Sequence, residues 1–433
     1  MQQTTQAQAR AARLASRALA STSLADRNRG LAAMAEALQT DKARILAANE
    51  ADLARSQAEG LPAPLLKRLR FDEAKLRDVL AGLSSLRNLP DPVGHTQLAR
   101  ELSPGLTLYR VSCPIGVIGV IFESRPDALV QIASLCLKSG NAVLLKGGRE
   151  AKETNRALYE ALARGTRAAG LPEGWIGLLE SREEVSDMLR MDEDIDLVIP
   201  RGSNDFVRYI MDHSRIPVMG HADGICHVYI DQDCDVEMAV RVAVDAKAQY
   251  VAVCNACETL LVHEAAASRV LTELKRAMDE AHVRLLGCEK TRAVIPVAPA
   301  AEADWDTEYL DYVLSIRVVP SLEAAIDHIN AHGSGHTDAI VTQDAQAAAT
   351  FLNGVDSAGV YWNCSTRFAD GFRYGFGAEV GIATGKVHAR GPMGLEGLTI
   401  YKYKLLGHGQ TVADFTEGRE VFTHRDLDEE CPL

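Results

Sequence analysis

Two cysteines stand close together in the segment CNACETLLVH, residues 254–263, and they are the residues of this chain best suited to chemistry. A zinc site built on a Cys-x-x-Cys pair needs a second pair of ligands, and none follows nearby. A dithiol redox motif opens a helix, whereas this pair precedes a predicted strand. Cys257 adjoins that strand and is interpreted as a buried packing residue. Cys254 lies in the loop before it, where a thiolate could attack a carbonyl carbon and form a thioester.

Two further segments combine glycine with polar residues after an apolar strand. In LLKGGREA, residues 144–151, Lys146 ends the strand and Arg149 follows two glycines. Ligands of open α/β sheets bind at that end of the strands, so these cations could hold a sugar hydroxyl and a phosphate. In IPRGSNDF, residues 199–206, Gly202 turns the chain and Ser203 starts a helix whose N–H groups could bind a phosphate. The alternatives are two surface cations and an ordinary capped helix.

Composition excludes several classes of protein. The chain of 433 residues has a net charge of −13, which makes nucleic acid an unfavourable partner. Its longest apolar run, residues 111–122, is far shorter than the roughly 20 residues that cross a bilayer. The N-terminus has no cleavage-like signal. Nine cysteines without disulfide-like spacing favour a reducing, cytoplasmic setting.

The positioning elements follow from hydrophobic periodicity. Residues 6–86 are mostly helical, and from residue 114 apolar strands alternate with helices. Such alternation predicts parallel sheets covered on both faces, which is the α/β class. The stretch 365–408 is rich in glycine and ends in the alternating strand LTIYKYKLLG. The polar tail from about residue 410 is expected to be poorly ordered.

Several segments occur together in a fixed order from about residue 8 to about residue 408. They resemble the γ-glutamyl phosphate reductases, also called glutamate-5-semialdehyde dehydrogenases, of the aldehyde dehydrogenase superfamily. The matching segments are PIGVIGVIFESRP (114–126), GNAVLLKGGREA (140–151), PRGSNDFVRYI (200–210), CNACETLLVH, GSGHTDAIVTQD (333–344) and RYGFGAEVGIATGKVHARGPMGLEGLTIYKY (373–403).

The resemblance implies an aldehyde-dehydrogenase-like α/β fold with a Rossmann-type cofactor domain, an α/β catalytic domain and a small oligomerisation β-segment. It also implies a homodimer or homotetramer, because such edge strands pair across subunits. The expected division is a cofactor-binding domain at 1–98 and 117–238, a catalytic domain at 239–388, oligomerisation strands at 99–116 and 389–408, and a C-terminal tail at 409–433.

The family form of the cysteine motif is Cys-Asn-x-x-Glu-Thr, which implies that Cys254 is the nucleophile. Cys257 then falls on a variable position. A free thiol has a pKa of about 8.5, so Cys254 needs nearby N–H dipoles or cations to react as a thiolate at pH 7.

The resemblance also assigns cofactor residues. Lys146 is implied to contact the adenosine ribose, and Gly202 and Ser203 to lie near the pyrophosphate. Glu308 matches by position the residue that holds the nicotinamide ribose. Arg149 replaces an acidic residue that favours a free 2′-hydroxyl. A cation suits a 2′-phosphate, so NADPH/NADP⁺ is the expected cofactor.

Two departures from the wider superfamily carry information. The segment VMGHADG, residues 218–224, lacks the glutamate that activates water in hydrolytic members, which fits an enzyme that passes its acyl group to or from phosphate. The segment Glu123-Ser124-Arg125 replaces a region with an oxyanion-binding asparagine. The Cys254 backbone N–H and Asn255 are the candidates for that role.

The implied reaction is the NADPH-dependent reduction of L-glutamyl 5-phosphate to L-glutamate 5-semialdehyde and phosphate through a cysteine thioester, the second step of proline biosynthesis from glutamate. An acidic protein with anionic substrates needs local cations. Arg125 and Arg367 are the candidates, with structural arginines as the alternative. His221 and His336 lie in glycine-rich loops and could be near the site, with a structural role as the favoured interpretation. No metal is expected.

Two alternatives stay open on the sequence. The first is an aldehyde dehydrogenase that uses coenzyme A, which also has no need of the hydrolytic glutamate. The second is a non-catalytic protein that kept the fold. The combination of Cys254, Lys146, Gly202 and Ser203 argues against the second.

Overall fold

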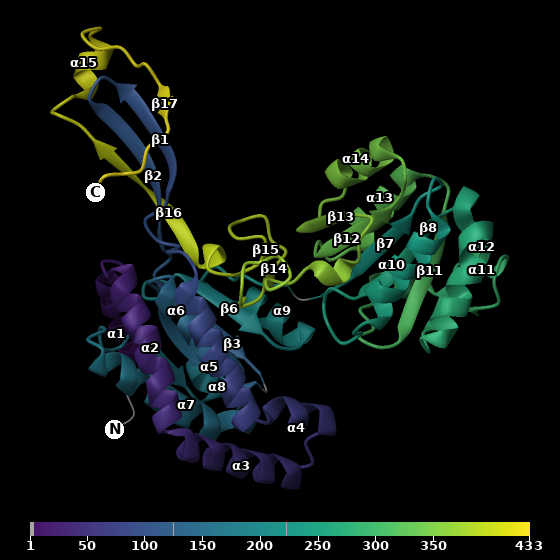
Figure 1. Ribbon diagram of the computed structural model, residues 1–433, viewed down its shortest axis with the longest axis horizontal. Coiled ribbons are helices and arrows are strands. Elements are labelled where there is room, and N and C mark those ends of the chain that lie inside the picture. The colour runs from purple at the N-terminus through teal and green to yellow at the C-terminus, as the bar shows by residue number, and fades with distance from the viewer. Residues whose placement is uncertain (1–3, 124, 222) are drawn as a thin grey trace.

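The computed structural model describes residues 4–123, 125–221 and 223–433. Figure 1 shows two α/β lobes side by side and an arm of antiparallel strands that rises from the first lobe. The α/β prediction is confirmed. Ser124 and Ala222, which fall in the two departing segments above, lie outside the described residues.

The first lobe is built on a parallel sheet with the strand order β5-β4-β3-β6. Its strands read as continuous apolar runs because helices cover both faces, and every residue of β3 is buried. We call this the first sheet. Its strands are β3 (Val117–Phe122), β4 (Ala142–Lys146), β5 (Ile176–Leu179) and β6 (Leu197–Arg201).

Helices pack around the first sheet and on one another. Pro126 opens α6, where its missing N–H costs no hydrogen bond. Gly140, just past the end of α6, has a φ of +76°, which favours glycine. The helices are α1 (Thr5–Leu19), α2 (Leu24–Thr40), α3 (Lys42–Ala58), α4 (Ala63–Leu69), α5 (Glu73–Asn88), α6 (Pro126–Lys138), η1 (Arg149–Ala151), α7 (Lys152–Ala168), α8 (Arg182–Met188) and α9 (Asn204–His213).

The second lobe holds a parallel sheet with the order β10-β9-β11-β8-β7-β12-β13, which we call the second sheet. Its core is separate from that of the first lobe. The strands are β7 (Cys226–Ile230), β8 (Cys257–His263), β9 (Arg284–Gly287), β10 (Ala298–Pro299), β11 (Val313–Val319), β12 (Thr337–Val341) and β13 (Gly359–Trp362).

Helices cover the second sheet in the same way. They are α10 (Val236–Ala248), α11 (Glu264–Glu280), α12 (Glu289–Arg292), α13 (Leu322–His332) and α14 (Ala345–Gly354), with short 3-10 turns η2 (Glu302–Asp306) and η3 (Thr366–Phe368). The sequence division at residue 238 falls after β7, whereas β7 pairs with β8 and β12 inside the second sheet.

The arm is an antiparallel sheet with the order β16-β2-β1-β17. The expectation of a poorly ordered tail is wrong at its end, because β17 pairs with β1 and covers that edge. Tyr109 on β2 donates a hydrogen bond to Glu429 at 2.5 Å, which ties the tail down further. The elements are β1 (Thr96–Ser103), β2 (Leu106–Pro114), η4 (Glu396–Leu398), β16 (Thr399–Leu406), α15 (Val412–Thr416) and β17 (Arg425–Leu427).

The glycine-rich stretch before β16 returns from the second lobe to the first. It contains the short pair β14 (Ile382–Ala383) and β15 (Gly391–Pro392), which lies between the two lobes in Figure 1. Val380 and Met393 from this stretch are fully buried in the core of the first lobe. The stretch therefore connects the second lobe to the hydrophobic core of the first lobe.

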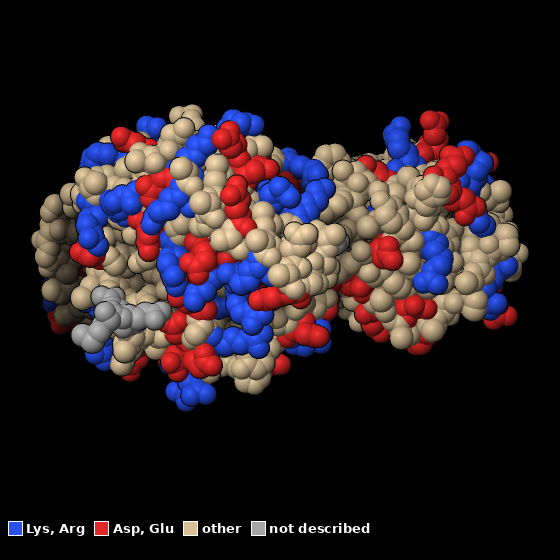
Figure 2. All heavy atoms as spheres, turned by 90° about the horizontal axis from the view of Figure 1, so that it is seen from below, with Lys and Arg blue, Asp and Glu red and all other residues tan. Residues whose placement is uncertain are grey.

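The surface has no broad field of one sign on the face drawn in Figure 2, where acidic and basic side chains are interspersed. Among the described residues, no helix combines the length and apolarity needed to cross a bilayer.

Candidate active site

The predicted nucleophile, Cys254, lies in the loop that joins α10 to β8. Its side chain is partly exposed, whereas Cys257, the first residue of β8, is fully buried. Burial also raises the pKa of the Cys257 thiol to about 12. Of the two cysteines, Cys254 is the one that a dissolved molecule can reach.

The loop around Cys254 packs closely against the chain at the start of β7. A Cβ placed on Gly224 would lie 2.4 Å from the Cα and the carbonyl oxygen of Cys254, so only glycine fits there. The Cys226 thiol donates a hydrogen bond to the same carbonyl oxygen at 3.2 Å. Gly224 lies just before β7 and Cys226 is its first residue, and β7 is the strand next to β8.

The loop is also held by hydrogen bonds to the 3-10 turn η3 and the residue that follows it. Asn255 is buried and its side-chain amide donates to the carbonyl oxygen of Ala369 at 2.8 Å. Thr366 donates through its hydroxyl to the backbone carbonyl of Asn255 at 2.8 Å. One amide hydrogen of Asn255 is therefore used to hold the loop, while its role as an oxyanion donor stays a prediction.

The surroundings of Cys254 favour the protonated thiol over the thiolate. Burial raises its pKa to about 12, and the carboxylates of Glu308 and Glu379 raise it further, against a lowering by Arg201 and a backbone N–H. Desolvation and like charge both disfavour a thiolate. The sequence predicts cations near Cys254 that would stabilise a thiolate. Arg201 is such a cation, but Glu308 and Glu379 raise the pKa of the thiol by more than Arg201 lowers it.

Cations do gather near Cys254. Arg201, at the end of β6, is electrostatically coupled to Cys254, and burial followed by its neighbour Arg125 lowers the pKa of its guanidinium. Arg367 is buried in η3, binds Gln249 through Nε at 3.1 Å and is also coupled to Cys254. Arg125 is exposed and pairs with Asp127 at 3.5 Å.

Two histidines lie beside the nucleophile. A ring nitrogen of His221, a ring nitrogen of His336 and the Cys254 sulfur all lie within 4.8 Å of one another. The two rings meet edge to face with their centroids 5.0 Å apart. The sequence favoured a structural role for both histidines and left a place near the site open, and the structure places them beside the Cys254 sulfur.

The predicted cofactor residues of the LLKGG segment lie at the end of β4. Lys146 is partly buried there, and burial lowers the pKa of its ammonium group. A Cβ on Gly147 would lie 2.0 Å from the amide nitrogen of Asn155, so the chain needs glycine to pass. Arg149 is highly exposed. Its one ion pair among the described residues is with Glu59, at 3.3 Å.

The predicted residues of the PRGSN segment lie at the start of α9. Ser203 precedes the helix but makes no capping hydrogen bond, so the first-turn N–H groups have no side-chain cap. Asn204 donates to Glu308 at 2.6 Å. This bond joins the first lobe to the segment before β11 and brings the cofactor candidates to the Cys254 side of the second lobe.

Comparison with known proteins decides the family. The aldehyde dehydrogenase family matches residues 1–311. The chain belongs to the aldehyde dehydrogenase family. That family uses a nicotinamide cofactor, and the chain has relatives in it that are oxidoreductases named γ-glutamyl phosphate reductase.

Relatives and a solved structure place the chain in one branch of the aldehyde dehydrogenase family. The γ-glutamyl phosphate reductase of Pelotomaculum thermopropionicum is 63% identical over 98% of this chain and 97% of its own length. That of Acetivibrio thermocellus is 62% identical over 94% of both. The crystal structure of the Thermotoga maritima γ-glutamyl phosphate reductase has a TM-score of 0.93 and 37% identity, covering 94% of this chain and 100% of that one. The resemblance found in the sequence is thereby confirmed.

Sequence reasoning missed Arg201 and Glu379 as neighbours of Cys254. Both fall inside segments that carried the family resemblance, but nothing in their spacing linked them to residue 254. Burial raises the pKa of the Glu379 carboxyl to about 6, and Arg201 opposes that rise. The one feature of the sequence that could have indicated Arg201 and Glu379 is that each is a charged residue close to glycine in a short motif. That feature alone does not predict a contact with Cys254.

Proposed function

We propose that this chain reduces L-glutamyl 5-phosphate to L-glutamate 5-semialdehyde and inorganic phosphate with NADPH, in the cytoplasm, as the second step of proline biosynthesis from glutamate. The proposal is supported by relatives of the same name that match the chain over nearly its whole length. The acyl phosphate is an activated substrate, which suits a cysteine that forms a thioester.

One observation carries the proposal beyond the name. The Asn204–Glu308 hydrogen bond, 2.6 Å long, holds the start of α9 next to a carboxylate that is itself coupled to Cys254. The start of α9 in the first lobe is thus held close to Cys254 of the second lobe. Cys254 is the partly exposed one of the two cysteines in the CNAC segment. A hydride donor held by the first lobe would face a thioester on the second.

The acylation step is written on this chain's own atoms. The Cys254 sulfur attacks the acyl carbon of L-glutamyl 5-phosphate, a C–S bond forms, the C–O bond to phosphate breaks, and inorganic phosphate leaves. The thiol proton needs an acceptor. His221 donates from Nδ1 to the Ile382 carbonyl oxygen at 2.8 Å, so its Nε2 carries a free lone pair. We assign the proton to that nitrogen.

Cations stabilise the negative charge that the substrate brings. Arg201 and Arg367 are coupled to the Cys254 thiol, and we propose that they bind the phosphate or the carboxylate of the substrate, with Arg125 at the outer edge. Guanidinium groups bind both anions through paired N–H donors. The Cys254 backbone N–H and Asn255 remain our candidates for the oxyanion.

Residues of the first lobe, together with Glu308 of the second, fit a nicotinamide dinucleotide phosphate. Lys146 would hold the adenosine ribose, Gly202 and Ser203 the pyrophosphate at the uncapped start of α9, and Glu308 the nicotinamide ribose. A Cβ on Gly202 would lie 2.9 Å from Phe206 and 3.0 Å from the carboxylate of Glu123, so glycine leaves the most room at the start of α9. NADPH, when bound, supplies the hydride that reduces the thioester to the aldehyde. Cys254 then regains a proton as the C–S bond breaks.

The test of this function is the reverse reaction. Glutamate 5-semialdehyde and NADP⁺ are expected to give NADPH, followed by absorbance, only when inorganic phosphate is present. Turnover without phosphate would mean that water takes the acyl group and would contradict the proposal. A rate that depends on coenzyme A instead of phosphate would assign the chain to the other branch considered above.

Arg149→Ala is expected to weaken the preference for NADPH over NADH. A hydrogen bond to a charged group contributes about 1.5–3 kcal/mol, so KM for NADPH should rise about 10- to 100-fold with little change for NADH. The measurement is kcat/KM with both cofactors. Arg164→Ala, an exposed arginine further along α7 that pairs with Asp41, is the matched control. Equal losses with both cofactors would refute a phosphate contact.

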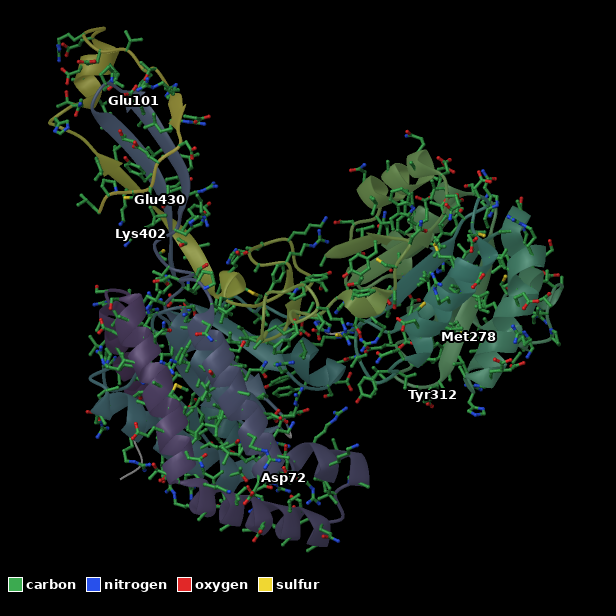
Figure 3. All side chains as sticks on the ribbon, in the orientation of Figure 1. Asp72, Glu101, Met278, Tyr312, Lys402 and Glu430 are labelled. Carbon is green, nitrogen blue, oxygen red and sulfur yellow. The ribbon has the colours of Figure 1, made fainter. Side chains whose placement is uncertain are left out.

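We propose that the chain forms a homodimer or homotetramer through β16, the longer of the two edge strands of the arm. Tyr401, Tyr403 and Leu405 lie on one face of this strand and are 44%, 59% and 54% exposed. An edge strand with an exposed apolar face favours pairing with a second copy. Figure 3 labels Lys402 on the same strand and Glu430 in the tail of the arm.

Light scattering on the purified chain is expected to give a dimer or tetramer, and the double change Tyr403→Lys with Leu405→Lys is expected to give a monomer. Both side chains are exposed in the single chain, so its fold and its far-ultraviolet circular dichroism should stay as in the parent. Leu14→Lys, at an exposed position on α1, is the matched control and should leave the assembly intact. A parent chain that scatters as a monomer would contradict the proposal.

A further inference from the structure

We propose that Cys254, His221 and His336 form a binding site for a borderline-soft divalent cation, Zn²⁺ first of all, and that the bound metal withdraws the nucleophile from use. The observation is that one ligand atom of each residue lies within 4.8 Å of the other two. The inference goes beyond the proposed reaction, because metal binding needs neither the substrate nor the cofactor.

The fold explains why these three residues meet. Cys254 precedes β8, His221 lies in the segment leading into β7, and His336 directly precedes β12. In the second sheet β7 lies between β8 and β12, and all three strands are parallel. The segments that lead into neighbouring parallel strands meet at one edge of the sheet, so the three side chains converge on one point.

His336 is the residue that points to a ligand. It is fully buried, and its Nε2 has no hydrogen-bond partner among the described residues. Its Nδ1 lies 2.9 Å from the hydroxyl oxygen of Thr337. An unpartnered polar atom in the interior is costly, and a metal ion that accepts its lone pair would remove that cost.

His221 is oriented as metal-binding histidines are. Its Nδ1 donates to the Ile382 carbonyl oxygen at 2.8 Å, which fixes the ring and leaves the lone pair on Nε2. A carbonyl behind the ligating imidazole is the usual outer partner in metal sites, where it holds the tautomer and the ring angle. The two histidines and the thiol thus offer three donors without breaking an existing hydrogen bond.

The donor set selects the metal. Two imidazoles with one thiolate suit Zn²⁺, Co²⁺ and Cd²⁺, whereas Mg²⁺ and Ca²⁺ prefer oxygen. Tetrahedral zinc, with Zn–S of about 2.3 Å and Zn–N of about 2.0 Å, holds sulfur and nitrogen about 3.5 Å apart. The present separations are at most 4.8 Å, so modest side-chain rotations shared by Cys254 and the rings bring the atoms to that distance.

Binding is balanced by one proton. The Cys254 thiol loses its hydrogen to solvent as the S–Zn bond forms, and the two imidazoles bind as neutral ligands. The fourth position stays open to water on the partly exposed side of the thiol. A sulfur held in this way cannot attack an acyl phosphate, so zinc is expected to inhibit reversibly.

The test uses the full chain in a non-thiol reductant, titrated with Co²⁺ and then with Zn²⁺. We expect one equivalent of Co²⁺ per chain with a near-ultraviolet thiolate charge-transfer band, displaced by one equivalent of Zn²⁺. Cys254→Ser should lose the band. His221→Ala and His336→Ala should each weaken Zn²⁺ binding by at least about 10-fold. Loss of a residue that only supports a metal ligand already costs about that much affinity.

Cys364→Ser is the matched control, since Cys364 is also a partly exposed free cysteine. It should leave the band and the zinc affinity unchanged. X-ray absorption of the zinc complex of the unaltered chain should give one sulfur and two nitrogen neighbours, a readout that needs no variant to fold. A band that survives in Cys254→Ser, a shell without sulfur, or zinc affinity unchanged in both histidine variants would overturn the proposal.

These outcomes are separable from the proposed reaction. A chain that binds Zn²⁺ with the expected ligands but forms no NADPH in the phosphate assay keeps this inference and loses the function. A chain that turns over but shows no thiolate band keeps the function and loses this inference.

Discussion

Cys254→Ala is expected to abolish phosphate-dependent formation of NADPH from glutamate 5-semialdehyde and NADP⁺. Removing a covalent nucleophile costs kcat at least about 10⁴-fold in enzymes of comparable logic, because the thioester route is lost as a whole. Cys254 is the partly exposed cysteine of its segment and lies among the cations and histidines of the site. The measurement is the absorbance of NADPH at saturating concentrations of both substrates.

Cys257→Ala is the matched control for that loss. Cys257 is fully buried as the first residue of β8 and its thiol donates to the carbonyl oxygen of Thr259 at 3.3 Å. The change should lower the unfolding temperature by a few degrees, as deletion of a buried group does, while kcat stays within about threefold. Activity that survives in Cys254→Ala but disappears in Cys257→Ala would move the nucleophile to Cys257.

The nucleophile loop illustrates what sequence could reach. A loop position before an apolar strand indicated that Cys254 could react, and the resemblance to the family motif Cys-Asn-x-x-Glu-Thr at residues 254–259 implied that it is the nucleophile. Alternation of apolar strands with helices predicted two parallel sheets, and both exist. Such local signals survive because strands buried on both faces must be apolar wherever they fall.

The protonation of Cys254 could not be reached in that way. The raised pKa of this thiol comes first from burial and then from Glu308 and Glu379, which come from segments on either side of η3 and meet Cys254 only through the fold. The histidines were visible in the sequence, yet their proximity follows from the order β8-β7-β12, which periodicity does not encode. Sequence located the elements, and long-range packing set the chemistry between them.

The tail shows the same limit in the opposite direction. Its polar, acidic composition predicted disorder from about residue 410, but β17 pairs with β1, and Arg425 of the tail reaches Glu101 of that strand at 3.2 Å. Composition reports how much apolar area a segment can bury, whereas an open sheet edge offers backbone hydrogen bonds that any sequence can use. The free edge of β1 therefore decides the outcome.

Gly224→Ala is expected to reduce kcat about 100-fold while leaving KM for NADPH within about threefold, because a nucleophile displaced by about 1 Å loses its alignment with the acyl carbon. The added Cβ would lie 2.4 Å from the Cα and carbonyl oxygen of Cys254 and 2.6 Å from its Cβ. Those atoms are mostly backbone, so the Cys254 loop must shift. Overpacking of this kind costs about 1–3 kcal/mol, and the unfolding temperature should fall by several degrees.

Gly220→Ala provides the matched control in the same segment. The three atoms nearest to a Cβ there all belong to Pro200 and lie at 3.6 Å or more, which is ordinary van der Waals contact. This variant should keep both kcat and the unfolding temperature close to those of the parent. If Gly224→Ala keeps full kcat, the loop can absorb the added methyl group, and the tight packing beneath Cys254 does not position the sulfur. If both variants lose kcat equally, the segment tolerates no side chain at either glycine, and the effect cannot be assigned to the contact with Cys254.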